Sequence, residues 1–409
     1  MSQASVQSVA IVYGFYIAQR GIAGLVLAVA LGQRYNDLRI DVYEASKEFG
    51  ELGLGLGMWP RPMSILARMG LGEQMKKIVS PLLDDKNGIS MEFRKSDSKE
   101  GYSIHSFTRA LSSMSSLSRQ DLQRILLDAV SQNPNCNCYS NHRLDTYEET
   151  NAGVTMRFTS GGSAQADLLV GADGIRSAVR RQMFPGLAHP KYVGYGVYRG
   201  LIQLEDIQSE EHTIALDRCV VYAGKNKHVI MYPISRGKFL NVVAFVQEPY
   251  SNAAMSHSQL LATFDGWERD VQLLLQHIPQ PIRMPLFVVE PYLSKWVSDG
   301  SRVVLLGDSA HAMRPHLGSG AGQAVEDAYV LASLLSKPLP EAVHAYDNTR
   351  REAAYRISGA SRTAGEAYDL YAPELVDEAD SMSDLGREKF RKIVDSGYVW
   401  SYAPFDFAE

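Results

Sequence analysis

Three glycine-containing stretches carry the residues best suited to chemistry, and the richest lies toward the end of the chain. Residues 302–328 read RVVLLGDSAHAMRPHLGSGAGQAVEDA, which predicts a buried strand joined to a long helix. Asp308 follows that strand directly, at the edge where ligands bind in open parallel sheets. Gly318, Gly320 and Gly322 then expose backbone N–H groups where the helix begins, and such a helix end stabilises an anion. This pattern predicts a binding loop.

A second stretch, residues 167–180, reads DLLVGADGIRSAVR and predicts a strand, a tight turn and a helix with a basic start. A purely structural turn would explain this pattern. The functional interpretation is a turn around Asp173 that packs against the diphosphate of a cofactor, with Arg176 and Arg180 close to anionic groups.

A third stretch lies near the N-terminus. Residues 8–12 (SVAIV) and 38–43 (LRIDVY) are β-branched runs typical of buried strands, and the apolar segment between them predicts a helix from Gly21. Gly21 and Gly24 form the second half of a dinucleotide-binding turn. Glu44 comes 20 residues after Gly24, the separation at which an acidic side chain reaches a ribose hydroxyl.

The link between the first strand and this turn is unusually long. Residues 13–20 stand where about two residues are normal, so that about six are extra, and Tyr13, Phe15 and Tyr16 are bulky. We consider three explanations, in this order: a splice artefact in the coding sequence, a tolerated insertion, and loss of cofactor binding. The last would leave a pseudoenzyme with a binding or regulatory role.

The remaining elements form a second lobe and a tail. Period-two alternation over residues 196–204, 228–234 and 239–246 predicts an antiparallel sheet, inserted into the nucleotide-binding unit. Residues 118–133 predict a helix with Ser118 as its N-cap. The tail after Ala372 is acidic and then aromatic, which suggests a docking segment.

Bulk properties exclude several classes of protein. The 409 residues are 45% hydrophobic and 21% charged, as in a globular protein with two or three lobes. A net charge of −5 gives no reason to expect nucleic acid as a partner. Three cysteines (Cys136, Cys138 and Cys219) argue against a disulfide framework or a metal site and favour the reducing cytoplasm. The apolar residues 11–32 are divided by polar residues, so we expect no transmembrane segment.

Together these motifs resemble one family. Glu44, Arg119 in SRQDL, GADGIRS, and GDSAHAMRPHLGSGAGQAVEDA occur in the order found in the FAD-dependent group A aromatic hydroxylases, and the chain is most similar to their fungal, salicylate hydroxylase-like members. The resemblance covers residues 8 to about 370. It implies an α/β fold: a glutathione-reductase-type, Rossmann-like FAD-binding domain with an inserted antiparallel β-sheet substrate lobe.

This resemblance also implies boundaries and roles. Residues 1–75, 105–180 and 290–365 would form the FAD-binding domain, residues 76–104 and 181–289 the substrate lobe, and residues 366–409 a C-terminal docking segment. Glu44 would bind the FAD ribose, Arg119 would lie near the diphosphate, and Asp308 would hold the ribityl or diphosphate region. Gly57 and Ala321 would be backbone contacts. The predicted cofactor-binding residues are Gly21, Gly24, Glu44, Gly57, Arg119, Asp173, Asp308, Gly318, Gly320 and Ala321.

Two residues of the lobe resemble the arginine and the tyrosine that relatives direct at the substrate. Arg199 in VYRG is expected to steady a phenolate or carboxylate, and Tyr232 in HVIMYP to hydrogen-bond the same oxygen. The structural alternatives are an ion-pair partner and edge packing. His311 and His316 are interpreted as shaping the flavin loop and not as bases.

The implied reaction is that of an FAD-dependent monooxygenase. NADPH or NADH, as a transient co-substrate, reduces FAD; O2 adds to form a flavin hydroperoxide, and one oxygen atom passes to a small aromatic substrate in a water-poor pocket. A role in secondary metabolism is expected. The alternatives are an FAD epoxidase or another oxidoreductase on the same fold, and a flavin-free pseudoenzyme. Both a monomer and a homodimer remain open.

Overall fold

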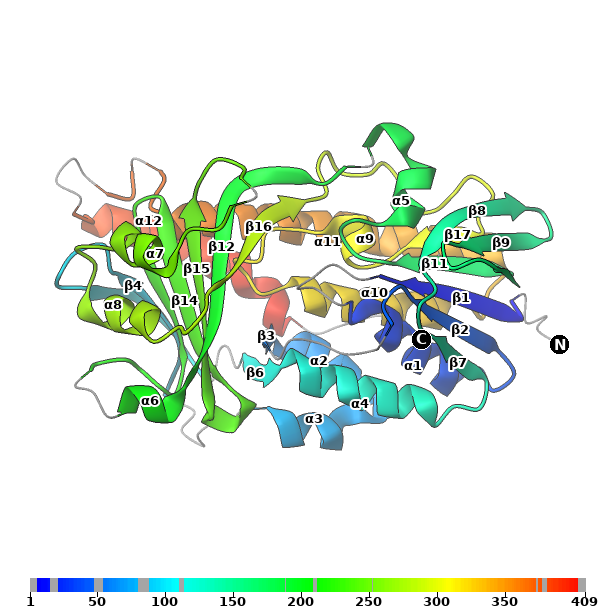
Figure 1. The fold of residues 1–409 in the computed structure, drawn as a ribbon, viewed down its shortest axis with the longest axis horizontal. Coiled ribbons are helices and arrows are strands. Elements are labelled where there is room, and N and C mark those ends of the chain that lie inside the picture. The colour runs from blue at the N-terminus through cyan, green and yellow to red at the C-terminus, as the bar shows by residue number, and fades with distance from the viewer. Residues whose placement is uncertain are drawn as a thin grey trace.

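The computed structural model describes residues 6–14, 21–47, 54–79, 88–109, 114–187, 189–208, 212–251, 253–372, 374–376 and 381–403. Residues 15–20 of the long N-terminal link lie outside these ranges, as do Phe405 and Phe407 of the aromatic tail. Figure 1 shows two lobes side by side, one built on a parallel sheet and the other on a large curved sheet.

The first lobe is built on a five-stranded parallel sheet. Its strands lie in the order β17 (Val303–Leu305), β11 (Leu168–Ala172), β1 (Ser8–Tyr13), β2 (Arg39–Glu44) and β7 (Cys136–Tyr139). The predicted buried runs form these strands because helices cover the sheet and leave no polar face. A small antiparallel sheet of β8 (Leu144–Thr150), β9 (Gly153–Phe158) and β10 (Ser163–Ala166) lies beside it.

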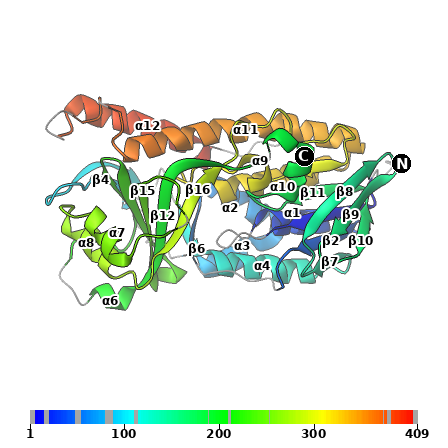
Figure 2. The ribbon, with the colours of Figure 1, turned by 45° about the horizontal axis from the view of Figure 1, so that its top comes forward.

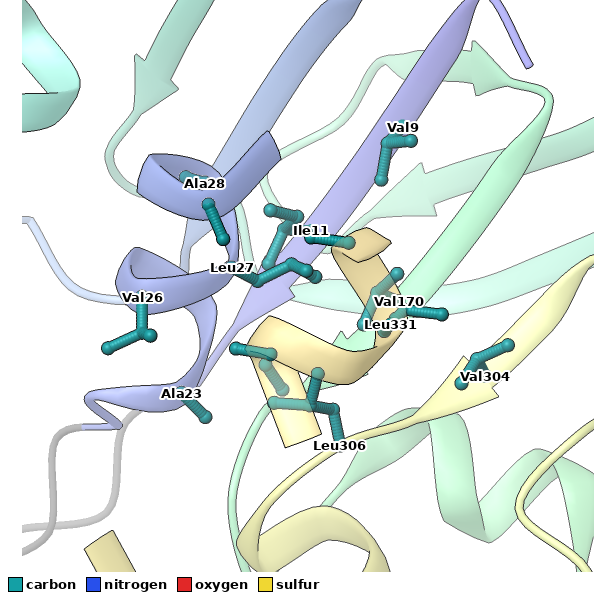
Figure 3. Close-up of a cluster of buried hydrophobic side chains, with 14 of the residues drawn as sticks. Val9, Ile11, Ala23, Val26, Leu27, Ala28, Val170, Val304, Leu306 and Leu331 are labelled. Carbon is teal, nitrogen blue, oxygen red and sulfur yellow. The ribbon is translucent and has the colours of Figure 1, made fainter. Parts of the chain in front are cut away.

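Two apolar helices pack together against the parallel sheet. They are α1 (Ala23–Arg34), which is buried on all sides from Ala23 to Leu31, and α10 (Gly320–Leu334). In Figure 3 their side chains, among them Leu27 and Leu331, meet those of Ile11 and Val170 in one cluster. The remaining helices of this lobe are α4 (Arg119–Ser131), α5 (Ala178–Met183) and α9 (Asp308–His311).

The second lobe is a seven-stranded sheet with two different faces. Its order is β16 (Ile282–Val288), β12 (Lys191–Gln203), β15 (Phe239–Gln247), β14 (Lys227–Ile234), β13 (Cys219–Gly224), β4 (Ile89–Lys95) and β5 (Tyr102–Thr108). The predicted antiparallel pairing holds except between β13 and β4, which are parallel. One face packs against α7 (His257–Thr263) and α8 (Arg269–Gln276), with α6 (Leu204–Gln208) after β12, and the other face turns toward the first lobe.

Long C-terminal helices connect the lobes. Helix α11 (Leu339–Tyr368) packs against α10 in the first lobe and β13 in the second, and α12 (Asp384–Tyr402) packs against α11 and β5. In Figure 2 both helices run along one side of the molecule. The elements β3 (Gly55–Met58), β6 (Ser115–Ser118), α2 (Pro60–Leu66) and α3 (Gly72–Ile78) complete the junction.

The residues on both sides of the long N-terminal link keep a strand–turn–helix arrangement. Tyr13 ends β1 with its ring fully buried, and its hydroxyl accepts a hydrogen bond from Gln123 Nε2 at 3.1 Å. A Cβ on Gly24 would lie only 2.9 Å from Cδ2 of the Tyr13 ring, so this glycine lets α1 pack onto the tyrosine. Among the described residues, none of the helices has both the length and the apolar character that crossing a membrane requires.

Candidate FAD and substrate site

A cavity of about 360 Å³ lies between the seven-stranded sheet and the carboxyl edge of the parallel sheet. Residues that follow three of the parallel strands line it: Gly21 and Ala23 after β1, Gly174 after β11, and Asp308 after β17. This is the edge at which doubly wound sheets bind their ligands. The glycine motifs of the sequence, far apart along the chain, therefore converge on one space.

Two helices begin at this cavity. Helix α1 begins at Ala23 and α10 at Gly320, and neither N-cap residue, Ile22 or Ser319, makes a side-chain capping hydrogen bond. The residues at both helix starts line the cavity. Backbone N–H groups and the helix dipole favour a negative charge at such ends. Two helix starts facing one cavity suit a ligand with two adjacent anionic groups, such as a diphosphate.

The glycines before α10 keep space open for that ligand. Gly318 has a φ of +59°, in the left-handed region that favours glycine. An added Cβ on Gly320 would meet only Asp308 Oδ1, at 4.0 Å, so it would project into the open cavity. Ala321 follows on the same turn and also lines the cavity. The small residues of this loop thus leave a cradle beside the helix start.

Charged and backbone groups reach the cavity from the opposite side. Arg119, the first residue of α4, lines it, and its backbone N–H donates to the carbonyl oxygen of Leu54 at 3.1 Å. Gly57 lines it from β3, the strand paired with β6. Ser118 stands at the N-cap of α4 as predicted, but its side chain makes no capping bond.

Three of the predicted cofactor residues do not line the cavity. Gly24 is buried within α1. Glu44 is fully buried at the end of β2, and its carboxylate accepts a hydrogen bond from the backbone N–H of Ser46 at 2.7 Å. Asp173 accepts one from the backbone N–H of Ala178 at 2.6 Å, which holds the start of α5. Their contact with a cofactor stays a prediction.

The two arginines of the second glycine motif have different positions. Arg176 lines the cavity, with its guanidinium carbon 5.9 Å from the centre of the Phe287 ring. Arg180 is only 1% exposed, and its Nη1 donates to the carbonyl oxygen of Ser309 at 2.7 Å. Arg180 therefore joins α5 to α9 and does not line the cavity, and its contact with anionic cofactor groups stays a prediction.

The inner face of the large sheet forms the opposite wall, and both predicted catalytic residues lie on it. Arg199 on β12 pairs with Val243 on β15, and Val243 pairs in turn with Ile230 on β14. Tyr232 lies two residues after Ile230 on the same strand. All four line the cavity because alternate residues of a strand share one face. Arg199 Nη2 donates to the carbonyl oxygen of Gly55 at 3.0 Å. Burial raises the pKa of Tyr232 to about 12, despite the opposing positive charges of Arg199 and Arg119.

Most of the rest of this wall is apolar. The side chains around Arg199 and Tyr232 come from this sheet, from the first lobe and from α12, and few of them can form hydrogen bonds. They include Met91, Met114, Val197, Cys219, Phe245, Met284, Leu286, Leu317 and Tyr398. The cavity thus combines an anion-binding end with an apolar end.

Some aromatic lining residues were not predicted from the sequence, and the two histidines of the flavin loop differ in position. Trp59 lies at the cavity wall and its Nε1 donates to the carbonyl oxygen of Leu317 at 3.0 Å. Tyr398, from the aromatic tail, packs against Trp59 with ring centres 4.9 Å apart. His316 turns its side chain to the cavity, whereas His311 is held by Asp327, with Nε2 2.6 Å from Oδ2. The aromatic character of the tail was the signal for Tyr398.

These residues fit FAD. The two uncapped helix starts and the glycine cradle suit its diphosphate, Arg119 adds a positive charge, and the Asp308 carboxylate is an acceptor for hydroxyl groups of the cofactor. The apolar sheet face leaves space for rings. Within the described residues, no group of three or more histidine, cysteine or acidic side chains is placed to hold a metal ion, and the three cysteines are free thiols.

Comparison with known proteins agrees with this geometry. A family model described as an FAD binding domain matches residues 17–360. The chain is 32% identical over 381 residues to a salicylate hydroxylase of Pseudomonas putida, covering 86% of this chain and 85% of that protein. A solved salicylate hydroxylase–substrate complex aligns with a TM-score of 0.79 and 28% identity, over 97% of this chain and 95% of that one. Klebsiella pneumoniae HpxO, solved with FAD and uric acid, aligns at 0.76 and 25%, over 96% and 95%. The chain therefore belongs to the FAD-dependent aromatic hydroxylases, a family of flavoprotein monooxygenases.

Proposed function

We propose that this monooxygenase hydroxylates a small phenolic ring that binds in the apolar end of the cavity, with NADPH or NADH and O2 as co-substrates. The observation that carries the proposal is the position of Arg199 and Tyr232 on an apolar wall that shares its cavity with the two helix starts. When bound, FAD supplies the redox chemistry that activates O2.

Arg199 is the proposed anchor for an anionic oxygen of the substrate. One of its nitrogens is fixed on the Gly55 carbonyl oxygen, which holds the guanidinium at the cavity wall. Tyr232 keeps its proton because its pKa is raised to about 12, so it donates a hydrogen bond to the same oxygen. Charge-assisted hydrogen bonds of this kind are stronger in a dry site.

The apolar lining has its own role. Residues such as Val243 and Phe245 expel water from the ring-binding end, which strengthens the polar contacts and protects reactive species from hydrolysis. We further propose the cytoplasm as the location, in line with three free thiols, and the domain boundaries given above. The choice between a monomer and a homodimer stays open.

The test compares Arg199→Ala and Arg199→Lys with wild type on a panel of phenols and hydroxybenzoates. Losing a charged hydrogen bond costs about 1.5–3 kcal/mol, so KM should rise roughly tenfold to hundredfold in Arg199→Ala. Flavin reduction by NAD(P)H should also lose its stimulation by substrate. Arg269→Ala, an exposed arginine of α8 in the same lobe, is the control. Unchanged turnover and unchanged stimulation in Arg199→Ala would show the assignment to be wrong.

A further inference from the structure

The backbone of Gly55, the first residue of β3, is held by two side chains of the large sheet. Its N–H donates to Oδ1 of Asn241 on β15 at 2.9 Å, and its carbonyl oxygen accepts from Nη2 of Arg199 on β12 at 3.0 Å. Gly55 lines the cavity, as do the next two residues of β3. A strand of the cavity wall is therefore fastened to the substrate lobe through one residue.

The packing around Gly55 leaves no space for a side chain. A Cβ at this position would lie 2.6 Å from Cγ of Asn241 and 2.8 Å from Cε2 of Tyr232. Asn241 and Tyr232 are register partners on β15 and β14, so they meet the β3 backbone as one surface. Glycine permits this close approach, but its backbone can also adopt many conformations. The direction of the Gly55 carbonyl group thus depends on the groups that hold this residue.

Asn241 has no part in the substrate contacts proposed above. Its side chain is fully buried and does not line the cavity. The atom that faces the Gly55 N–H must be an acceptor, so the amide oxygen points to β3. Nδ2 has no hydrogen-bond partner within the described ranges. A buried amide costs free energy unless it is hydrogen-bonded, and the bond to Gly55 is what Asn241 provides in return.

The two polar groups of the substrate wall depend on the same point. Burial raises the pKa of Tyr232, and the charge and hydrogen bond of Arg199 partly offset that rise, so Arg199 and Tyr232 are in contact. Arg199 in turn is fixed on the Gly55 carbonyl oxygen. On the other side of Gly55, the carbonyl oxygen of Leu54 accepts from the backbone N–H of Arg119, which lines the anion-binding end. Gly55 therefore lies between the predicted cofactor contacts and the predicted substrate contacts.

We propose that Asn241 is a positioning residue: by holding the Gly55 N–H, it directs the Gly55 carbonyl oxygen at Arg199 and so fixes the guanidinium that anchors the substrate anion. The inference rests on the proposed function, in which Arg199 is that anchor, and names a residue that acts through it. Without the Asn241 oxygen, the Gly55 backbone is free to turn. Arg199 then keeps its charge but loses its fixed direction, and substrate binding weakens.

The test is a double-mutant cycle of Asn241→Leu and Arg199→Ala on the FAD-loaded enzyme without reduced nicotinamide. Leucine keeps the branched shape of asparagine and removes the acceptor. The probe is 4-nitrophenol at a pH where it is anionic, and absorbance titration gives its Kd. Asn241→Leu should raise this Kd about three- to tenfold, the effect of one hydrogen bond. In the Arg199→Ala background it should change the Kd less than about twofold, because the group that it positions is absent.

Two further variants complete the experiment. Gly55→Ala pushes the same backbone away from Asn241 and Tyr232, so it should also raise the Kd of the probe. Asn137→Leu is the matched control and should bind the probe as wild type does, since Asn137 Nδ2 donates to Asp41 at 3.0 Å on the parallel sheet, outside the cavity. Circular dichroism and retained flavin absorbance show that each variant is folded.

The outcomes separate this inference from the proposed function. A wild-type Kd in Asn241→Leu or in Gly55→Ala would overturn the positioning role while the phenolic site stands. Equal losses from Asn241→Leu in both backgrounds would also overturn it, because a general structural effect does not depend on Arg199. If Arg199→Ala binds the probe as wild type does, or if wild type binds no probe, the proposed function fails and this inference fails with it.

Discussion

Replacing His316 with glutamine should make the fold less sensitive to acid. In the folded protein, burial and the neighbours His228 and Arg314 lower the pKa of His316 well below its ordinary value of 6.5. In the unfolded chain the same group titrates near that ordinary value. At pH values below about 6.5, His316 binds a proton in the unfolded chain but not in the folded protein. The stability that His316 contributes is therefore complete above about pH 6.5 and is lost as the pH falls.

The size of this effect follows from the two pKa values. For an unfolded pKa of about 6.5 and a folded pKa far below the working range, protonation of the unfolded chain costs about 1.4 kcal/mol at pH ~5.5 and less than about 0.1 kcal/mol at pH ~7.5. Glutamine cannot titrate. The difference in unfolding free energy between His316→Gln and wild type should therefore move by about 1.4 kcal/mol over this interval, in favour of the variant.

Urea unfolding of wild type and His316→Gln at pH ~5.5 and pH ~7.5 measures how the difference between their unfolding free energies changes with pH. Any pH-independent effect of the substitution cancels, as do the contributions of titrating groups that do not interact with His316. His105→Gln serves as control, because its ring lies beside the partly exposed Asp395 and not in the cavity. If wild type and His316→Gln lose the same stability between the two pH values, then His316 is not a neutral buried imidazole, and the reasoning about its pKa is refuted.

Two other substitutions test the cradle and the core. Gly320→Val should weaken FAD binding about five- to hundredfold in a flavin fluorescence titration, since its Cβ projects into the cavity and crowding of this kind costs about 1–3 kcal/mol. Gly359→Ala is the control and should bind FAD normally, because its Cβ meets no atom within 4 Å. If Gly320→Val binds FAD as tightly as Gly359→Ala does, the proposed role of the glycine cradle is wrong. Arg350→Met should lower the free energy of unfolding by about 3–5 kcal/mol, because it removes the buried cation that Glu326 and Asp327 share, although these carboxylates retain Arg61 and His311 as partners. The exposed pair of Arg362 with Glu366 on the same helix is worth less than about 1 kcal/mol, so a similar loss in Arg362→Met would show that burial is not the cause.

The sequence predicted the fold where burial controls residue choice. A parallel strand covered on both faces must be apolar throughout, so residues 8–12 and 302–306 reveal β1 and β17. The large sheet has one face on helices and one on a cavity, and its period-two pattern reveals β12, β14 and β15. The glycine motifs predicted a common ligand because strand ends in such a sheet meet at one edge.

Other features depend on contacts that no local pattern records. The docking segment expected from residue 366 begins inside α11, a 30-residue helix whose buried face includes Asp347 and Arg350 and so lacks a clean apolar stripe. The direction of a side chain is equally hidden: His311 and His316 stand five residues apart in one motif, yet one is held by Asp327 and the other lines the cavity. Only tertiary packing separates their roles.

The residues on either side of the long N-terminal link show that its length does not prevent formation of the cofactor site. Its bulky first residue, Tyr13, does not stand in the path of a ligand, because its ring is buried under α1 and hydrogen-bonded to Gln123. Gly21, on the other side, lines the cavity. Lengthening a link from about two to eight residues is two doublings, which costs on the order of 1.2 kcal/mol of loop-closure entropy. Strand β1 and helix α1 are held by a shared apolar core, and burying one or two large side chains offsets a cost of that size. A tolerated insertion is thus physically sufficient, and the length of the link gives no reason to expect loss of FAD.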